Sequence, residues 1–206
     1  MQSKKDARIR EEVDRLGRPS AAMLVREIAR EERKIAYRRL LRSALVCILA
    51  VVAVTVLVTN LFLAVVQIDG SSMSPLLQRD EIVISLRGGN PGKNDVIAFY
   101  QNNKLHIKRV IAVSGEAVDI AEDGTVSVNG AALEEPYVRE PSRGSCDITF
   151  PYTVPPETLF VLGDNRESSM DSRRSHFGCV NREQIVGKVV FRFWPIRRIG
   201  GISSES

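Results

Sequence analysis

The sequence is poor in the residues that build metal centres and disulfide frameworks. Its 206 residues include three cysteines and two histidines, His106 and His176. No spacing among these residues matches a metal site. Cys47 lies in an apolar segment, and the sequence leaves open whether Cys146 and Cys179 form a disulfide. A reaction that requires a histidine base therefore has only two candidates.

Charge is absent from residues 43–66, which read SALVCILAVVAVTVLVTNLFLAVV. As a helix this segment would be about 36 Å long, enough to cross a bilayer core of about 30 Å. A buried core helix of this length normally shows a polar face. A cleaved signal peptide has a shorter apolar run that ends in small residues. The sequence therefore predicts a retained membrane anchor at residues 43–66.

Positive charge is concentrated before that segment. Residues 1–42 contain 13 Lys/Arg and 7 Asp/Glu, whereas the remaining 164 residues contain 16 and 18. The positive-inside rule then predicts three parts: a cytoplasmic tail (1–42), the anchor (43–66) and an extracytoplasmic domain (67–206). The basic tail can contact anionic lipid and does not indicate a nucleic-acid surface. Gly17 is a typical helix stop and Ser20 a typical helix cap, so the tail is predicted to be helical.

Long helical patterns are absent after residue 66, where short β-rich runs alternate with turn signals. An antiparallel, partly closed β-domain is the expected fold class. The Pro-rich stretch 134–157 is expected to loop out. The predicted strands are residues 81–86, 95–100, 105–113, 117–120, 125–130, 159–162 and 185–196.

A reactive hydroxyl is suggested by GSSM, residues 70–73. Ser72 lies six residues after Val66, at most about 20 Å from the bilayer edge, although a Gly-Ser linker turn gives the same pattern. A serine needs a neighbouring base to become a nucleophile. In LHIKRV, His106 and Lys108 share one face of the strand, and periodicity alone does not choose between them.

Three blocks together resemble bacterial type I signal peptidase. GSSMSPLL resembles the nucleophile box of that family, HIKRVIAVSGE resembles its lysine box, and GDNRESSMDSR (163–173) resembles its signature. Leu76, His106 and Glu167-Ser168 depart from the usual pattern. The family's eukaryote-like branch has histidine where the bacterial enzymes have lysine, so Lys108 indicates the bacterial type.

The resemblance implies a membrane-bound serine endopeptidase, in which Ser72 is the nucleophile and Lys108 the general base. To act as a base, the lysine needs a pKa depressed by roughly 2 to 3 units, which burial can provide. The Ser72 N–H would stabilise the oxyanion, but Gly70 stands where many members provide a serine hydroxyl. The supporting residues implied are Ser169, which orients the lysine amine, together with Asp171, Arg173, Asp164 and Arg109.

The same resemblance implies removal of N-terminal signal peptides from secretory precursors at the plasma membrane of a bacterium. Cleavage would follow small residues at positions −1 and −3, and no cofactor or metal is implied. The peptide would add as a strand against two chain segments. The binding residues implied or adjacent are Gln67, Ile68, Asp69, Met73, Leu77, Leu105, His106 and Ile107.

Two other functions remain open at this stage. One is a Ser-His-Asp hydrolase that uses His106 or His176. The other is a catalytically silent, membrane-tethered β-module that binds exported chains.

Overall fold

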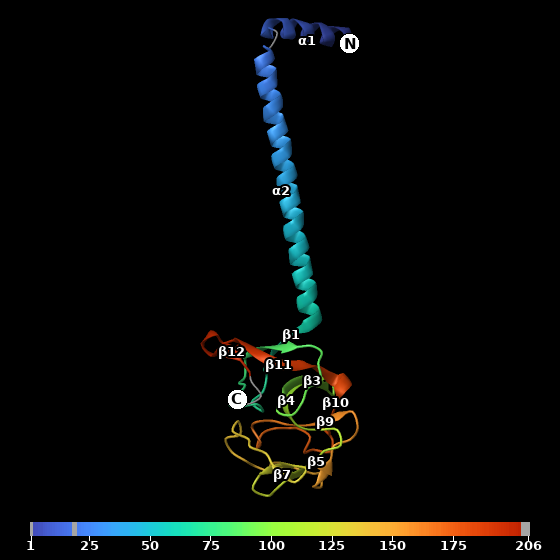
Figure 1. Cartoon of the computed structure of the whole chain (residues 1–206), viewed down its shortest axis with the longest axis vertical. Helices are drawn as coiled ribbons and strands as arrows, with labels where there is room; N and C mark the ends of the chain where they lie inside the picture. The colour runs from blue at the N-terminus through green and yellow to red at the C-terminus, as the bar shows by residue number, and fades with distance from the viewer. Residues whose placement is uncertain (1, 18–19, 203–206) are drawn as a thin grey trace. The chain divides into compact units, whose positions relative to one another are not determined.

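A computed structural model describes residues 2–17 and 20–202 of the chain. The chain divides at Leu57 into two compact units. Helix α1 (Gln2–Leu16) and most of helix α2 (Ala21–Phe62) form the first unit, and the strands form the second (Figure 1).

Gly17 and Ser20, the two helix signals predicted from the sequence, lie at helix ends. Gly17, directly after α1, has a φ of 67°, the left-handed conformation that commonly ends a helix. The Met23 N–H bonds the Ser20 carbonyl at 2.9 Å and the Ser20 hydroxyl at 3.3 Å. Ser20 is therefore the cap of α2.

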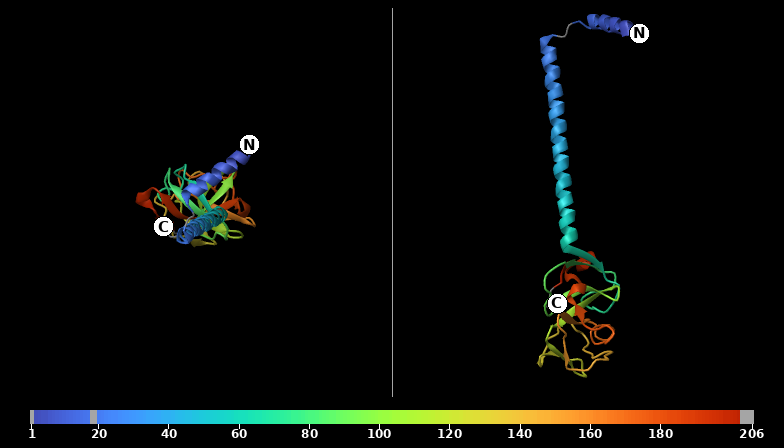
Figure 2. Two further views of the ribbon diagram at one scale, coloured as in Figure 1. Left: turned by 90° about the horizontal axis from the view of Figure 1, so that it is seen from above. Right: turned by 90° about the vertical axis from the view of Figure 1, so that its right-hand side faces the viewer.

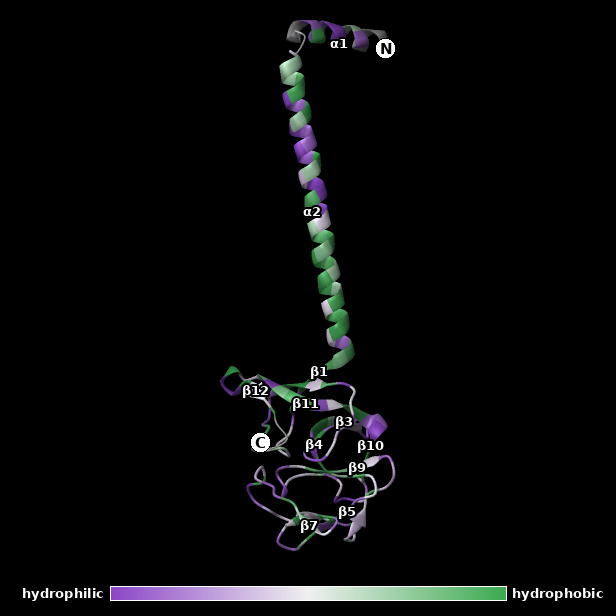
Figure 3. Cartoon of the chain, in the orientation of Figure 1, coloured by the Kyte–Doolittle hydropathy of each residue, from purple (hydrophilic) through white to green (hydrophobic). Residues whose placement is uncertain are grey.

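Helix α2 has a charged first half and an apolar second half (Figure 3). Within the described residues it is the one helix long and apolar enough to cross a membrane. It ends at Phe62, four residues before the predicted end of the anchor, because Leu63–Gln67 form strand β1. Ala64 and Val66 point into the core while Val65 and Gln67 are exposed, a period of two that belongs to a strand.

The larger sheet is antiparallel and has the order β1-β2-β11-β3-β4-β9-β10, with β12 paired to β11. The smaller sheet has the order β7-β6-β5-β8 and lies at the opposite end of the unit from β1 (Figures 1 and 2). Neither sheet closes on itself, so the expected partial closure is not found. The bounds are β2 Ile82–Leu86, β3 Val96–Gln101, β4 Lys104–Val113, β5 Ala117–Ile120, β6 Val126–Val128, β7 Ala131–Ala132, β8 Tyr152–Thr153, β9 Thr158–Leu162, β10 Val180–Asn181, η1 Arg182–Gln184, β11 Ile185–Trp194, η2 Ile196–Arg198 and β12 Gly200–Gly201.

Two-residue turns set the register of the strands. Asn129 and Gly130, both with positive φ, join β6 to β7 as the sequence predicts. Asn102 and Asn103 join β3 to β4 in the same way. This hairpin places Lys108 directly opposite Ile97.

Residues 134–157 pack onto the domain, contrary to the expectation that they loop out. Tyr137 is 6% exposed and Val154 is 1% exposed. β8 pairs with β5, and Asp147 accepts a hydrogen bond from the Ser175 N–H. The prolines break regular structure, but the apolar residues between them are still drawn into the core.

The core covers both faces of the larger sheet. Val96 and Ala98 of β3 belong to one buried cluster with Met73 and Leu77, whereas Ile97 and Phe99 belong to another. A third cluster lies between the two sheets and contains Ile111, Val118, Val126 and Phe160, among others. Strand β4 is therefore surrounded by protein along its second half, where Lys108 and Arg109 lie.

Candidate active site

A groove of about 290 Å³ lies between the chain around the end of β1 and the first half of β4. Seven of the eight predicted binding residues line it, together with Val66, Gly70 and Ser72. The exception is Leu77, which is fully buried in the core. Leu77, expected as a wall of the groove, does not line it and belongs to the same buried cluster as Met73.

Open strand edges form the two sides of this groove. β1 is an end strand of the larger sheet. β9 pairs only with Arg109–Val113 of β4, which leaves 104–108 without a strand partner on that side within the described chain. Four antiparallel steps separate β1 from β4, so the two strands run in the same direction. Unpaired backbone groups therefore face the groove from both sides.

The Ser72 turn is bonded to the signature segment 163–173. The Asn165 N–H donates to the Ser72 carbonyl at 3.0 Å, and Asn165 Nδ2 donates to the Ser71 carbonyl at 3.4 Å. Ser72 is half-buried and Ser71 is exposed. In the described part of the chain, the Ser72 N–H donates no hydrogen bond, as an N–H that is to bind a substrate oxygen requires.

Gly163 explains how close Ser72 and Ser169 come to each other. A Cβ at this position would lie 2.3 Å from Ser169 Oγ and 2.5 Å from the Ser72 carbonyl oxygen, so a larger residue would force the two serines apart. Sequence reasoning missed both Gly163 and Asn165 as spacing residues. Their place inside the signature block was the available signal.

Lys108 is 3% exposed. Its pKa is lowered from 10.5 to about 8: burial is the largest cause, the charge of Arg173 acts in the same direction, and Asp171 and Asp164 oppose the shift. Among the described residues, its amine forms no hydrogen bond or ion pair. Ser169 Oγ is also buried without a hydrogen-bond partner in that part of the chain. The structure therefore leaves the Lys108 amine and the Ser169 hydroxyl buried and without hydrogen bonds in the described chain.

Asp171 and Arg173 form a buried bidentate pair. Arg173 Nε lies 2.8 Å from Asp171 Oδ1, and Nη2 lies 3.0 Å from Oδ2. Asp171 Oδ2 also accepts from the Gly163 N–H, and Arg173 donates to the carbonyls of Arg166 and Arg143. Both side chains are at most 1% exposed, so this is a buried pair and not a weak surface ion pair.

Arg109 and Asp164 form a second buried pair, with both contacts at 2.9 Å. Arg109 also donates to the Asn94 carbonyl and stacks on the ring of Tyr137 at 3.7 Å. The Arg109–Asp164 pair anchors the signature segment to strand β4 beside Lys108, whereas the Asp171–Arg173 pair lies within the segment and binds the Arg143 carbonyl.

A third buried pair was not predicted. Arg166 binds Glu135 through two contacts of 3.0 and 2.5 Å and donates to the Gly163 carbonyl at 3.1 Å. Arg166 belongs to the signature block, but nothing local in the sequence marks Glu135 as its partner.

Neither histidine is part of a triad. His106 packs against Phe99 and Phe177, with ring centroids 5.9 and 5.4 Å away. Burial, followed by the charges of Lys108 and Lys104, lowers its pKa. His176 is exposed. No hydrogen bond or ion pair joins either histidine to a carboxylate of the described chain.

The sequence left open whether Cys146 and Cys179 form a disulfide. In the structure both cysteines are free.

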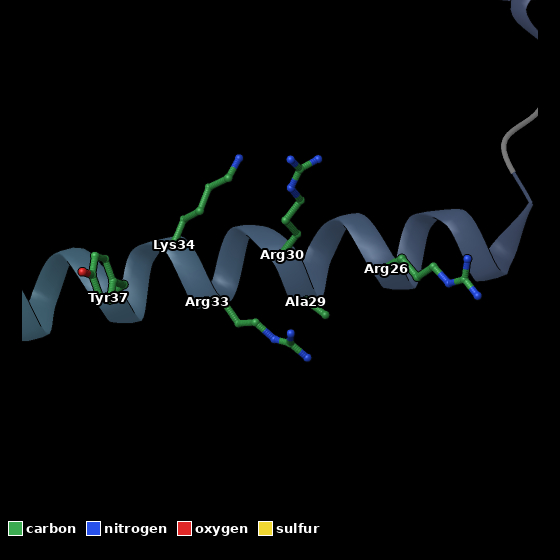
Figure 4. A pocket seen from close by; sticks show the side chains of 6 residues that line it. All are labelled: Arg26, Ala29, Arg30, Arg33, Lys34 and Tyr37. Atoms are coloured by element: carbon green, nitrogen blue, oxygen red, sulfur yellow. The ribbon is translucent and has the colours of Figure 1, made fainter.

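A second hollow lies on α2 and is distant in sequence from the groove. Figure 4 shows its lining, which comes from this helix alone. It contains four cations, Arg26, Arg30, Arg33 and Lys34, all exposed. It contains none of the predicted site residues.

Comparisons with known proteins agree with these features. A family model described as signal peptidase, peptidase S26, matches residues 40–194. The chain is 39% identical to signal peptidase I of Bacillus caldolyticus over 147 residues, 64% of this chain and 79% of that protein. It is 40% identical to signal peptidase IB of Staphylococcus aureus over 149 residues, 62% of this chain and 76% of that protein. A crystal structure of a signal peptidase I from Enterococcus faecalis V583 covers 48% of this chain and 97% of its own, with 33% identity and a TM-score of 0.42.

The matched region and the named relatives define a serine endopeptidase. The chain belongs to the signal peptidase family, peptidase S26.

Lys108→Met is expected to stabilise the protein at neutral pH. The folded-state pKa of Lys108, about 8, lies below its ordinary value of 10.5. Burial of this amine therefore lowers the free energy of unfolding by its full amount below pH 8 and has no effect above pH 10.5. The stability gain of the variant should therefore shrink as the pH rises from 8 to 10.5. Urea unfolding of the full chain in detergent at several pH values measures this. Lys104→Met, at an exposed position of the same strand, is the matched control. A gain that is independent of pH would contradict the buried-amine account.

Proposed function

We propose that the chain is a membrane-anchored signal peptidase I, in which Ser72 and Lys108 form the catalytic dyad. The observation that carries this proposal is a half-buried serine in a groove between two open strand edges. The strand that forms one of these edges carries a buried lysine with a pKa of about 8. A base with such a pKa is partly neutral near physiological pH.

In the proposed reaction, the neutral Lys108 amine takes the proton from the Ser72 hydroxyl as Ser72 Oγ attacks the scissile carbonyl. The Ser72 N–H, which has no acceptor in the described part of the chain, donates to the oxyanion. The protonated lysine then gives its proton to the leaving amine, and an acyl-enzyme remains. A water molecule, activated by the same amine, releases the signal peptide and restores Ser72.

The supporting residues act through position. The Ser169 hydroxyl is buried beside Gly163 and has no other partner in the described chain, so it is available to orient the lysine amine. The Asp171–Arg173 and Arg109–Asp164 pairs hold the segment that carries Ser169. Burial is the largest cause of the lowered pKa of Lys108, and the charges of Asp171, Arg173 and Asp164 act on it in opposing directions.

The substrate is proposed to bind as an extended strand between β1 and β4. Its backbone would pair with the open edges at Gln67 to Asp69 and Leu105 to Ile107. Side chains at −1 and −3 then point the same way. Ile68, Met73 and Ile107 line the groove and are buried or half-buried, so the space for those side chains is shallow.

The domain boundaries and orientation complete the proposal. Residues 1–42 would be cytoplasmic, the apolar part of α2 would span the bacterial plasma membrane, and the β-domain would lie outside. The excess of basic residues before the anchor supports this orientation. The exposed cations of α2 in Figure 4 suit contact with anionic lipid headgroups.

Ser72→Ala is expected to abolish cleavage of a secretory precursor while the fold is retained, because it removes the nucleophile. Ser71→Ala, at the exposed neighbouring position, should keep substantial activity. Purified full-length protein in detergent, a precursor substrate and N-terminal sequencing of the product provide the measurement. Activity in Ser72→Ala with loss in Ser71→Ala would reverse the assignment. No cleavage by the wild-type protein would favour a binding module.

Substrate choice should follow from the shallow groove. Replacing Ala at −1 or −3 of the precursor by Leu or Phe should reduce kcat/KM strongly, because overpacking costs about 1 to 3 kcal/mol per site. A large residue at −2 should be tolerated, since it points away. A precursor series varied at one position at a time tests this. Efficient cleavage with Phe at −1 would contradict the strand arrangement.

A further inference from the structure

A cluster around the buried residue Glu81, next to the Ser72 turn, takes no part in the mechanism above. Glu81, whose side chain is 3% exposed, lies between two arginines from the far end of the chain. Its Oε2 is 3.0 Å from Arg192 Nε, and its Oε1 is 2.6 Å from Arg198 Nη1. The Gln78 N–H also donates to Oε2 at 3.1 Å. The carboxylate thus has charged or polar partners on both oxygens.

Other nitrogens of the two arginines bind backbone carbonyls three and four residues after Ser72. Arg198 Nη2 donates to the Pro75 carbonyl at 3.2 Å and to the Leu76 carbonyl at 3.4 Å. Arg192 Nη2 donates to the same Leu76 carbonyl. Glu81 therefore orients two guanidinium groups, and other N–H groups of these guanidiniums bind the chain that leaves the Ser72 turn.

The chain that enters the Ser72 turn is hydrogen-bonded to Glu81 and to the residue before it. The Ile68 N–H donates to the Glu81 carbonyl at 2.9 Å, and the Asp80 N–H donates to the Ile68 carbonyl at 2.8 Å. Ile68 lines the groove. Glu81 therefore contacts the groove wall before Ser72 directly, and it contacts the backbone after Ser72 through the two arginines.

We propose that Glu81, Arg192 and Arg198 form a carboxyl-terminal clamp that positions Ser72 against the groove. All three are positioning residues, and the inference rests on the proposed function of Ser72. Arg198 lies in η2, beyond the residues 40–194 matched by the family model. The clamp therefore gives Arg198, in the segment after β11, a role in positioning the nucleophile.

Position matters here because acylation requires the Ser72 hydroxyl to meet the scissile carbonyl at a fixed distance and angle. A misplacement of about 1 Å, even one caused by a remote change, can lower the rate by about 100-fold. If the chain after the Ser72 turn were less firmly held, the reactive geometry would be populated less often. The open-edge groove would still bind the peptide, so kcat should fall while KM changes little.

The test compares Arg198→Ala with Arg197→Ala in the full-length protein in detergent, using a peptide with Ala at −1 and −3. Arg197 is the exposed neighbour and serves as the matched control. Arg198→Ala should lose about 10- to 100-fold in kcat with little change in KM, whereas Arg197→Ala should behave as the wild type. Because the Arg198 side chain is 34% exposed, added guanidinium ion at low millimolar concentration should reach the vacated site and restore part of the rate.

Rescue separates positioning from stability, since guanidinium would not restore an enzyme that is merely less stable. A wild-type kcat in Arg198→Ala, or a loss that guanidinium does not reverse, would overturn the clamp. If Arg198→Ala does not fold, Arg198→Lys decides: a lower kcat at unchanged KM supports the clamp, and a wild-type kcat overturns it. Ser72→Ala is run in parallel. Activity in that variant would refute the proposed function, whereas inactivity there beside a normal Arg198→Ala would refute the clamp alone.

Discussion

The constraint on which the site depends is the cost of burying the amine of Lys108. An ammonium group removed from water is destabilised, and this lowers its pKa to about 8. The burial comes from the sheet itself, because Lys108 lies opposite the fully buried Ile97 in the β3–β4 hairpin. The property that would make it a base is therefore produced by the same packing that stabilises the domain.

Charged groups close to this amine have to be neutralised in pairs. An unpaired carboxylate near Lys108 would raise its pKa, and an unpaired arginine would be costly to bury. Asp171 with Arg173 and Asp164 with Arg109 answer both requirements, and Glu135 with Arg166 adds a third pair along the same segment. These pairs carry the loop that brings Ser169, Gly163 and Asn165 to the Ser72 turn. The buried ion pairs thus hold this segment in place, and because each pair is neutral they do not strongly favour the protonated form of Lys108.

Much of this organisation was readable from the sequence. The seven expected strands are present, since period-two alternation and asparagine or glycine turns act locally. The segment 163–173 bonds the Ser72 turn through Asn165 and strand β4 through Asp164, and the groove beside Ser72 is lined by most of the residues expected there. The family assignment follows from the same blocks.

What could not be read depends on contacts between distant residues. β1 was assigned to the anchor because Leu63–Val66 are as apolar as the helix before them, and only their pairing with β2 reveals a strand. Leu77 was expected in the groove, but its side chain is fully buried in the core, and this depends on the packing of distant residues around it. Glu135 with Arg166, and Glu81 with Arg198 at a separation of 117 residues, carry no local pattern at all.

The central claim, that Lys108 is the base, is tested most directly by the pH dependence of kcat/KM for the wild-type protein and for His106→Ala. Because the neutral amine is the reactive form, kcat/KM should rise with pH on an apparent pKa of about 8 in both proteins. A histidine base with a lowered pKa would instead give a rise below pH 6.5. That lower profile, together with its loss in His106→Ala, would contradict the account.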